Sequence, residues 1–241
     1  PLDSRSPFCL FSKNDYEAST RGEDMYDFHN FALTPMQDLI VNITILSLLV
    51  LAILRAERRM ETSSPFAILA IITLFCVAGR ILLDPIPNVQ PVTVTIILVG
   101  IFYGAPWAIA VSGIVALSTN MIFLGHGPWT LFQVIGWATV GVAGSIFAEK
   151  LIVDGRIAVG RLMVLAAVSA FAFDWIVSTS ILLNHDFSTL LTYLANGIVF
   201  DMYHAAGNVA FVAWLANPFS HLMLRHKIAS SGRAVSEVVS N

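Results

Sequence analysis

The stretch Gly125-His126-Gly127-Pro128-Trp129-Thr130 separates two long apolar runs, residues 107–124 and 131–148. Glycine, proline and a polar histidine interrupt the hydrophobic sequence here, so this stretch is not ordinary lipid-facing helix. It also carries more side-chain function than a bare connector needs. The pattern predicts two membrane-spanning helices joined by a turn that helps to form an extracellular binding site.

The composition of the whole chain agrees with this interpretation. Of its 241 residues, 56% are hydrophobic and 12% are charged, whereas about a quarter of the residues of soluble domains are charged. The mean hydropathy is +0.76. The chain is therefore expected to be an all-α integral membrane protein. No basic cluster suggests nucleic acid, and Cys9 and Cys76 lie in environments too different for a disulfide or a metal pair.

Seven apolar segments are candidate spans, and each is followed by charged, proline-rich or glycine-rich sequence. The predicted spans are residues 39–54, 65–83, 92–103, 107–124, 131–148, 162–183 and 190–214. The segment 92–103 is short for about 30 Å of hydrocarbon unless protein covers its end. Residues 1–37 read as a polar tail without the features of a signal peptide.

The distribution of charge orients these spans. Basic residues should collect in cytoplasmic loops, and with the acidic N-terminal tail outside, each basic group falls inside. These groups are Arg55/Arg58/Arg59, Lys150/Arg156/Arg161 and Arg225/Lys227/Arg233. The sequence thus predicts a multi-pass protein of the cell membrane with its N-terminus outside and its C-terminus cytoplasmic. Loops 84–90, 125–130 and 184–188 lie outside, and loop 149–161 lies on the opposite side.

Polar residues near the first outer loop each have more than one interpretation. Arg80 lies about one turn from the end of its span, so it could extend to the membrane interface, pair with Asp84 or contact a ligand directly. Asn88, Gln90 and Thr93 follow prolines, and they could either cap a helix or face the same cavity as Arg80.

Trp129, Gln133 and Trp137 are spaced by four and therefore share one helical face. Isolated tryptophans would fit the aromatic belt of a membrane protein. A polar amide between two indoles is better suited to the wall of a pocket. His126, between two glycines, is either a loop residue or a ligand contact.

Acidic residues inside spans are costly and usually face protein or water, which draws attention to Asp174 and Asp201. Asp201, His204 and Asn208 form one stripe of the last span. They could make a hydrogen-bonded strip against other helices or line the cavity. His126, His185, Asp186 and His204 lack metal-ligand spacing on one element, so no metal site is expected. Because no hydrolase, protease or Walker A motif occurs, we expect neither an enzyme nor a cofactor.

Four blocks, in order, carry a resemblance to a known family. They are Ala78-Gly79-Arg80, Ile86-Pro87-Asn88-Val89-Gln90-Pro91-Val92-Thr93, Gly125-His126-Gly127-Pro128-Trp129-Thr130 with Gln133, and Phe200-Asp201-Met202-Tyr203-His204-Ala205-Ala206-Gly207-Asn208. The chain resembles the substrate-specific S component of an energy-coupling factor (ECF) vitamin transporter, in particular the branch that includes cobalamin-type S components.

The resemblance implies a six-helix core over residues 64–228 that captures a vitamin-sized micronutrient from outside. It also implies a T component and two ATPase subunits as partners. Residues 38–56 would be an extra N-terminal transmembrane helix, and residues 229–241 a cytoplasmic tail. The Ala-x-x-x-Ala docking motif of the family is not literal here, and Ala70, Thr73 and Val77 occupy that region.

The sequence and the resemblance together give a set of candidate substrate-binding residues. They are Arg80, Asn88, Gln90, Thr93, His126, Trp129, Gln133, Trp137, Asn184, Asp201 and His204. Mixed polar and aromatic side chains suit a heterocyclic ligand, for which a corrinoid is one candidate. The alternative is a membrane-embedded structural or regulatory subunit without a ligand, whose outer loops dock a partner.

Overall fold

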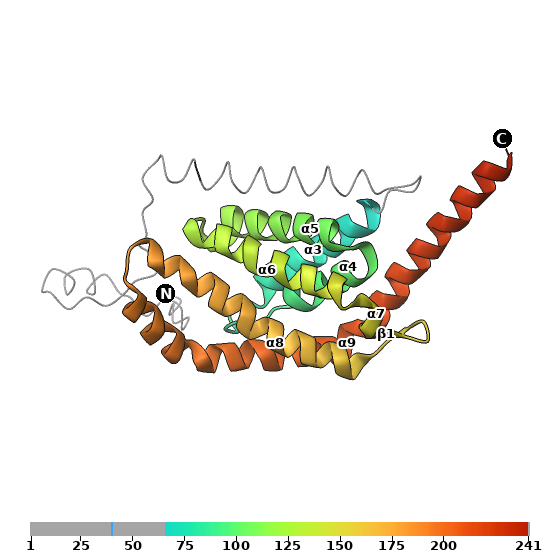
Figure 1. Cartoon of the computed structure of the whole chain (residues 1–241). Helices are drawn as coiled ribbons and strands as arrows, with labels where there is room; N and C mark the ends of the chain where they lie inside the picture. The colour runs from blue at the N-terminus through green and yellow to red at the C-terminus, as the bar shows by residue number, and fades with distance from the viewer. Residues whose placement is uncertain (1–39, 41–65, 241) are drawn as a thin grey trace, which may run out of the picture.

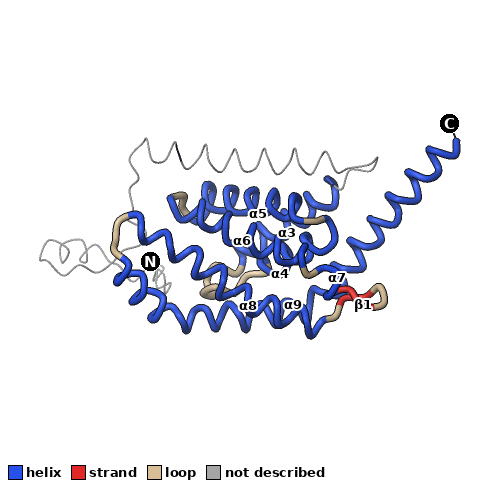
Figure 2. The backbone as a smooth tube through the Cα atoms, in the orientation of Figure 1, coloured by secondary structure: helices blue, strands red, loops and turns tan. Residues whose placement is uncertain are grey.

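The computed structural model describes Ile40 and residues 66–240. The predicted polar tail, residues 1–37, lies outside the described residues, as does the predicted extra helix 38–56 apart from Ile40. Helices dominate the described part, and a two-stranded hairpin is its strand element (Figure 2). The prediction of a predominantly helical protein is therefore confirmed for this part of the chain.

Helices follow one another with short connections, and their labels are those of Figure 1. The elements are α3 (Phe66–Leu82), α4 (Val92–Tyr103), α5 (Ala105–Thr119), the π-helical turn η1 (Asn120–Leu124), α6 (Pro128–Ile146), α7 (Ala148–Leu151), β1 (Ile152–Val153), β2 (Arg156–Ile157), α8 (Val159–Ser178), the 3-10 turn η2 (Thr179–Leu183) and α9 (Phe187–Ser240).

Four of these segments are long and apolar enough to cross a membrane, among the residues that the structure describes. They are Ala105–Ile122, Pro128–Ile146, Val159–Leu183 and Phe187–Lys227, and two shorter apolar helices cover Ile68–Leu82 and Val92–Tyr103. Large apolar side chains such as Leu74, Val164 and Trp214 are exposed on the outer surfaces of α3, α8 and α9. These features are compatible with a multi-pass membrane protein.

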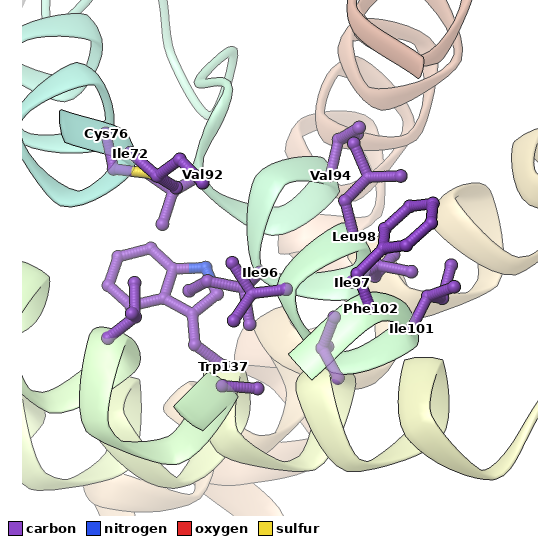
Figure 3. Packing of buried hydrophobic residues seen from close by; sticks show 14 of the residues in the cluster. Ile72, Cys76, Val92, Val94, Ile96, Ile97, Leu98, Ile101, Phe102 and Trp137 are labelled. Atoms are coloured by element: carbon purple, nitrogen blue, oxygen red, sulfur yellow. The ribbon is translucent and has the colours of Figure 1, made fainter. Parts of the chain in front are cut away.

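The short helix α4 is the centre of the bundle. All of its residues from Val92 to Phe102 are buried, and it packs against α3, α5, α6, α8 and α9. Figure 3 shows Ile96 of α4 beside the indole of Trp137 on α6, with Ile72 and Cys76 of α3 nearby. A helix that is apolar all round belongs in such a position. Protein therefore covers the segment that seemed too short to span a bilayer alone.

Glycines allow α4 and α6 to approach closely. A Cβ atom at Gly100 would overlap the carbonyl oxygen of Gly141, and one at Gly144 would overlap the carbonyl oxygen of Ile97. Both neighbours are backbone atoms that cannot rotate away. These glycines therefore permit the close contact between α4 and α6, as small residues do at helix contacts in membranes.

Several predicted boundaries are wrong, each for a local reason. Residues 128–130, predicted as loop, form the first turn of α6, because Pro128 has a φ suited to helix and needs no N–H there. The predicted loop 149–161 contains α7, the β1–β2 hairpin and the first turn of α8. The last predicted span ended at residue 214, but α9 continues through Pro218 to Ser240. Residues 229–240, predicted as a tail, are therefore helical.

The connections sort to two ends of the bundle. Figure 1 shows the α5–α6 and α8–α9 connections toward one end and the β1–β2 hairpin at the other. Because the chain alternates in direction, α3 ends and α4 begins on the side of the first two connections. The C-terminal part of α9 projects away from the bundle beside the hairpin.

Candidate functional site

A buried polar cluster lies within the end of the bundle where α3, α5 and α8 finish and α4, α6 and α9 begin. Its centre is Arg80, in the last turn of α3, which is only 5% exposed. A guanidinium inside a membrane protein needs compensating partners, since a lone arginine at the centre of a spanning helix costs about 2.5–3.5 kcal/mol on insertion scales.

Arg80 finds those partners on α5, η1 and α6. Its Nη1 donates to Thr119 Oγ1 and to Asn120 Oδ1, the latter at 2.9 Å, and its Nη2 donates to Gln133 Oε1 at 3.2 Å. The guanidinium carbon lies 4.9 Å from the centroid of the Trp137 ring, a cation–π distance. Arg80 is therefore buried rather than extended to the interface. Asp84 interacts with it electrostatically but forms no direct ion pair with it in the described part of the chain.

The amide groups beside Arg80 are tied to one another. Asn120 Nδ2 donates to Thr130 Oγ1 at 2.8 Å and to Gln133 Oε1 at 2.7 Å. Gln133 Oε1 thus accepts from both a guanidinium and an amide. This arrangement fixes the junction between the π-helical turn η1 and the first turns of α6.

Sequence reasoning missed Thr119 and Asn120. The available signal was a pair of adjacent polar residues inside the apolar run 107–124, where a buried hydroxyl and amide need partners. Asn120 also opens a π-helical turn, and such turns are frequent at functional sites.

A directed chain of hydrogen bonds continues from Trp137. The indole Nε1–H donates to Thr93 Oγ1 at 3.2 Å, and Thr93 Oγ1 lies 3.0 Å from His204 Nε2. His204 Nδ1 lies 2.8 Å from Asp174 Oδ2. Because a carboxylate only accepts, Nδ1 carries the proton, and in neutral His204 the Nε2 atom accepts from the Thr93 hydroxyl.

This chain links four helices, and all of its side chains except that of Asp174 are almost fully buried. Thr93 is 1% exposed and Trp137 is 2% exposed, so Trp137 is not part of an aromatic belt. Its ring also stacks on Phe173 with a centroid separation of 4.7 Å. Thr93 bonds to α6 and α9 rather than capping α4, whose N-cap position is Pro91.

Asp174 receives a second contact from the loop between α3 and α4. Asn88 Nδ2 donates to Asp174 Oδ1 at 3.5 Å, so Asn88 does not cap α4 either. Its backbone has a φ of 56°, which asparagine tolerates better than most residues. Asp174, noted in the sequence as a costly acid, was not among the candidate binding residues, although it joins Asn88 to His204.

The stripe on α9 is buried against α8, as its spacing predicts. Trp175 Nε1 donates to Asp201 Oδ2 at 3.0 Å, and Asn208 Nδ2 donates to the carbonyl oxygen of Ala166 at 3.0 Å. With the His204–Asp174 bond, three positions of α9 thus hold α8 by polar contacts. A hydrogen-bonded strip, rather than an open cavity wall, describes these contacts.

Other predicted residues lie apart from Arg80. The Trp129 ring lies against its own loop, where it would overlap a Cβ atom at Gly127, and His126 is half-buried in the same loop. Asn184 is exposed at the end of η2. Gln90 is half-buried, and its side chain makes no hydrogen bond within residues 66–240. No group of three metal-ligating side chains gathers in the described part of the chain.

The predicted docking residues lie on α3, away from the cluster. Ala70 is exposed, the Thr73 hydroxyl donates to the Leu69 carbonyl oxygen at 2.7 Å, and Val77 packs partly against the core. An exposed small residue at position 70 leaves this part of the α3 surface open to a neighbouring helix.

Comparison with known proteins gives one family. The model of a family of unknown function, DUF6580, matches residues 60–230. No curated protein and no solved structure matches the chain. The matched range includes every described residue of the cluster around Arg80, and the chain belongs to the DUF6580 family.

Proposed function

We propose that this protein is the substrate-binding membrane subunit of an ECF-type importer. It would capture a vitamin or related micronutrient from outside and deliver it through a T component and two ATPase subunits. The four sequence blocks that resemble S components support this proposal, because each of them supplies residues of the buried cluster around Arg80 or of the chain from Trp137 to Asn88. Cobalamin or another corrinoid is the candidate ligand that the resemblance favours.

The observation that carries the proposal is the incomplete satisfaction of Arg80. A guanidinium has five N–H groups, and three of them donate to Thr119, Asn120 and Gln133. Its Nε atom is buried and has no hydrogen-bond partner among the described residues. A buried N–H without a partner costs about 1–3 kcal/mol, which an anionic ligand group would recover through a charge-assisted bond.

The proposal includes a topology. The protein would lie in the cell membrane with a six-helix core over residues 64–228, preceded by an extra helix at 38–56. Its N-terminus would be outside and its C-terminus cytoplasmic, as the positive residues near the hairpin and on α9 suggest. In that orientation the cluster around Arg80 lies beneath the outer loops, where a ligand would arrive.

Ligand binding can be tested by thermal unfolding of the purified protein with a panel of vitamins. A ligand at 100 times its dissociation constant should add about 2.7 kcal/mol to stability. Gln133→Ala should reduce this gain because it removes an acceptor that orients Arg80. Thr139→Ala, on an exposed face of the same helix, is the control. Equal gains in both variants would remove Gln133 from the site.

The second candidate function is a ligand-free structural or regulatory subunit. It is favoured by the bonds among Thr93, His204, Asp174 and Asn88, which are formed between protein groups without any ligand. This function predicts that no vitamin stabilises the protein and that no small molecule purifies with it. The same unfolding experiment therefore separates the two candidates.

A further inference from the structure

A second site lies at the opposite end of the bundle from Arg80. A cavity of about 280 Å³ opens between the end of α4, the β1–β2 hairpin and α9. An adjoining hollow of about 480 Å³ follows α9 and shares Asn217, His221 and Arg225 with the cavity. These three residues are spaced by four, so they line one face of the helix.

Pro218 accounts for the position of the cavity. Proline inside a helix removes the hydrogen bond to the carbonyl of residue 214 and bends the chain. After Pro218, α9 still packs against the bundle through Met223 and Leu224, and the hairpin lies beside this part of the helix before its C-terminal end projects away (Figure 1). The space between the hairpin and α9 is therefore part of the fold. It is set by Pro218 of α9 and by the four paired residues of the hairpin.

The lining of the cavity is amphipathic. Phe102 and Ile157 are buried on its inner side, 6% and 7% exposed. Arg156 and Arg225 stand at its exposed side, one from the hairpin and one from α9. Neither guanidinium forms an ion pair or a hydrogen bond within residues 66–240. Two unneutralised arginines on facing elements favour a doubly coordinated anion.

The surroundings add positive charge. Lys227 Nζ donates to the carbonyl oxygen of Phe102 at 3.4 Å, which holds a third cation beside the cavity. Asp154 lies in the hairpin turn, but it is not among the residues that line the cavity. The apolar helices α4 and α9 both reach this level, where a bilayer would change from hydrocarbon to headgroups.

We infer that this cavity binds a phosphate group through Arg156 and Arg225. An apolar inner side beside two arginines suits the phosphate of an anionic phospholipid, whose glycerol and acyl carbons would contact Phe102 and Ile157. A free organic phosphate has the same charged group without the chains. The site is separate from the proposed vitamin site and does not depend on it.

Native mass spectrometry of the purified full chain tests this inference, with phosphatidylglycerol, phosphatidylcholine and glycerol phosphate as probes. Arg156→Gln with Arg225→Gln should weaken retention of phosphatidylglycerol about tenfold or more, because two charge-assisted contacts are lost. The control is Lys150→Gln with Arg161→Gln, which removes the same charge at the same end but outside the cavity. This control variant should retain phosphatidylglycerol to within about twofold of the wild type.

The outcomes separate the source of the phosphate. Arginine-dependent retention of phosphatidylglycerol that glycerol phosphate does not displace identifies a lipid. Displacement by glycerol phosphate identifies a phosphate site open to soluble ligands. The inference is overturned if both double variants lose the lipid equally, if neither loses it, or if phosphatidylcholine is retained equally well regardless of the arginines.

Discussion

Replacement of Thr93 by valine tests the hydrogen-bonded chain at its middle. The Thr93 hydroxyl accepts from Trp137 Nε1 at 3.2 Å and lies 3.0 Å from His204 Nε2. Valine has nearly the same shape as threonine but replaces the hydroxyl by a methyl group. The variant therefore leaves an indole N–H and an imidazole nitrogen without partners, and it creates almost no cavity.

The expected loss of stability follows from the number of hydrogen bonds lost and from the burial of their partners. Both bonds join different helices, and interhelical bonds in membranes average about 0.6 kcal/mol with a maximum of about 1.7 kcal/mol. In water-soluble proteins, an unsatisfied buried polar group costs about 1–3 kcal/mol. Because both partners are almost fully buried, we expect Thr93→Val to cost about 1–3 kcal/mol, roughly a 5- to 150-fold change in the unfolding equilibrium.

Thr95→Val is the matched control. Thr95 is on the same helix and is also fully buried, but its hydroxyl donates at 2.8 Å to the carbonyl oxygen of Pro91, and its partner on another helix is the Cys76 thiol, which is only a weak donor. That carbonyl also accepts from the Thr95 amide at 3.1 Å, so it stays satisfied after substitution. Reversible unfolding in mixed detergent micelles should give Thr93→Val a clearly lower free energy of unfolding than Thr95→Val. Equal stabilities would refute the argument that the chain between helices stabilises the bundle.

A double-mutant cycle assigns the effect to one bond. Trp137→Phe removes the donor of the bond to Thr93 and keeps an aromatic ring. If the bond is real, the double variant should be less destabilised than the sum of the two single variants, by about 0.6–1.7 kcal/mol. Additive effects would mean that the two side chains stabilise the protein independently.

Two further predictions concern packing and a helix cap. Gly144→Ala should destabilise the protein by about 1–3 kcal/mol in the same unfolding assay, because its Cβ would overlap the backbone of α4. Gly160→Ala, which meets no atom within 4 Å, should be neutral or slightly stabilising, and an equal loss in both would contradict the close α4–α6 approach. Asp186 accepts bonds from the Thr189 amide at 2.9 Å and hydroxyl at 2.7 Å, and these bonds lower the pKa of Asp186 below 3.8. Asp186→Ala should therefore lower stability at neutral pH, and circular dichroism melts should show the difference disappearing as the pH falls through the lowered pKa. A difference that persists in acid would mean that the carboxylate charge is not responsible.

Local sequence patterns predicted much of the helical framework. Apolar length located α3, α4 and α8 within a few residues, and the spacing of Asp201, His204 and Asn208 predicted one buried stripe. Such features depend on residues close together in the chain. The predicted tail, residues 1–37, and the predicted extra helix, residues 38–56, lie outside the described residues apart from Ile40, so both stay predictions.

Long-range partners could not be read from the sequence. Arg80 and Thr119 are 39 residues apart, and His204 and Thr93 are 111 residues apart, so no periodicity brings them together. The burial of α4 likewise depends on the helices around it. The last predicted span ended at residue 214, but α9 continues through Pro218, because a proline can kink a helix without ending it.

Trp129 and Trp137 show that helical spacing predicts a shared face but not the contacts of each side chain. They lie on one face of α6, yet Trp137 contacts Arg80 and Phe173 in the core, whereas the Trp129 ring lies against Gly127 in its own loop. Spacing predicted the face, and tertiary packing decided what each indole touches. Trp129 therefore braces the stretch that interrupts the two apolar runs.

Mass spectrometry of the small molecules that purify with the protein in mild detergent tests the proposed function most directly. The proposal predicts one compound of vitamin size with an anionic group, present in stoichiometric amount. Its occupancy should fall in Arg80→Lys, which keeps the charge but loses the geometry of the guanidinium. Protein that carries no such compound, and that no vitamin stabilises, would contradict the proposal.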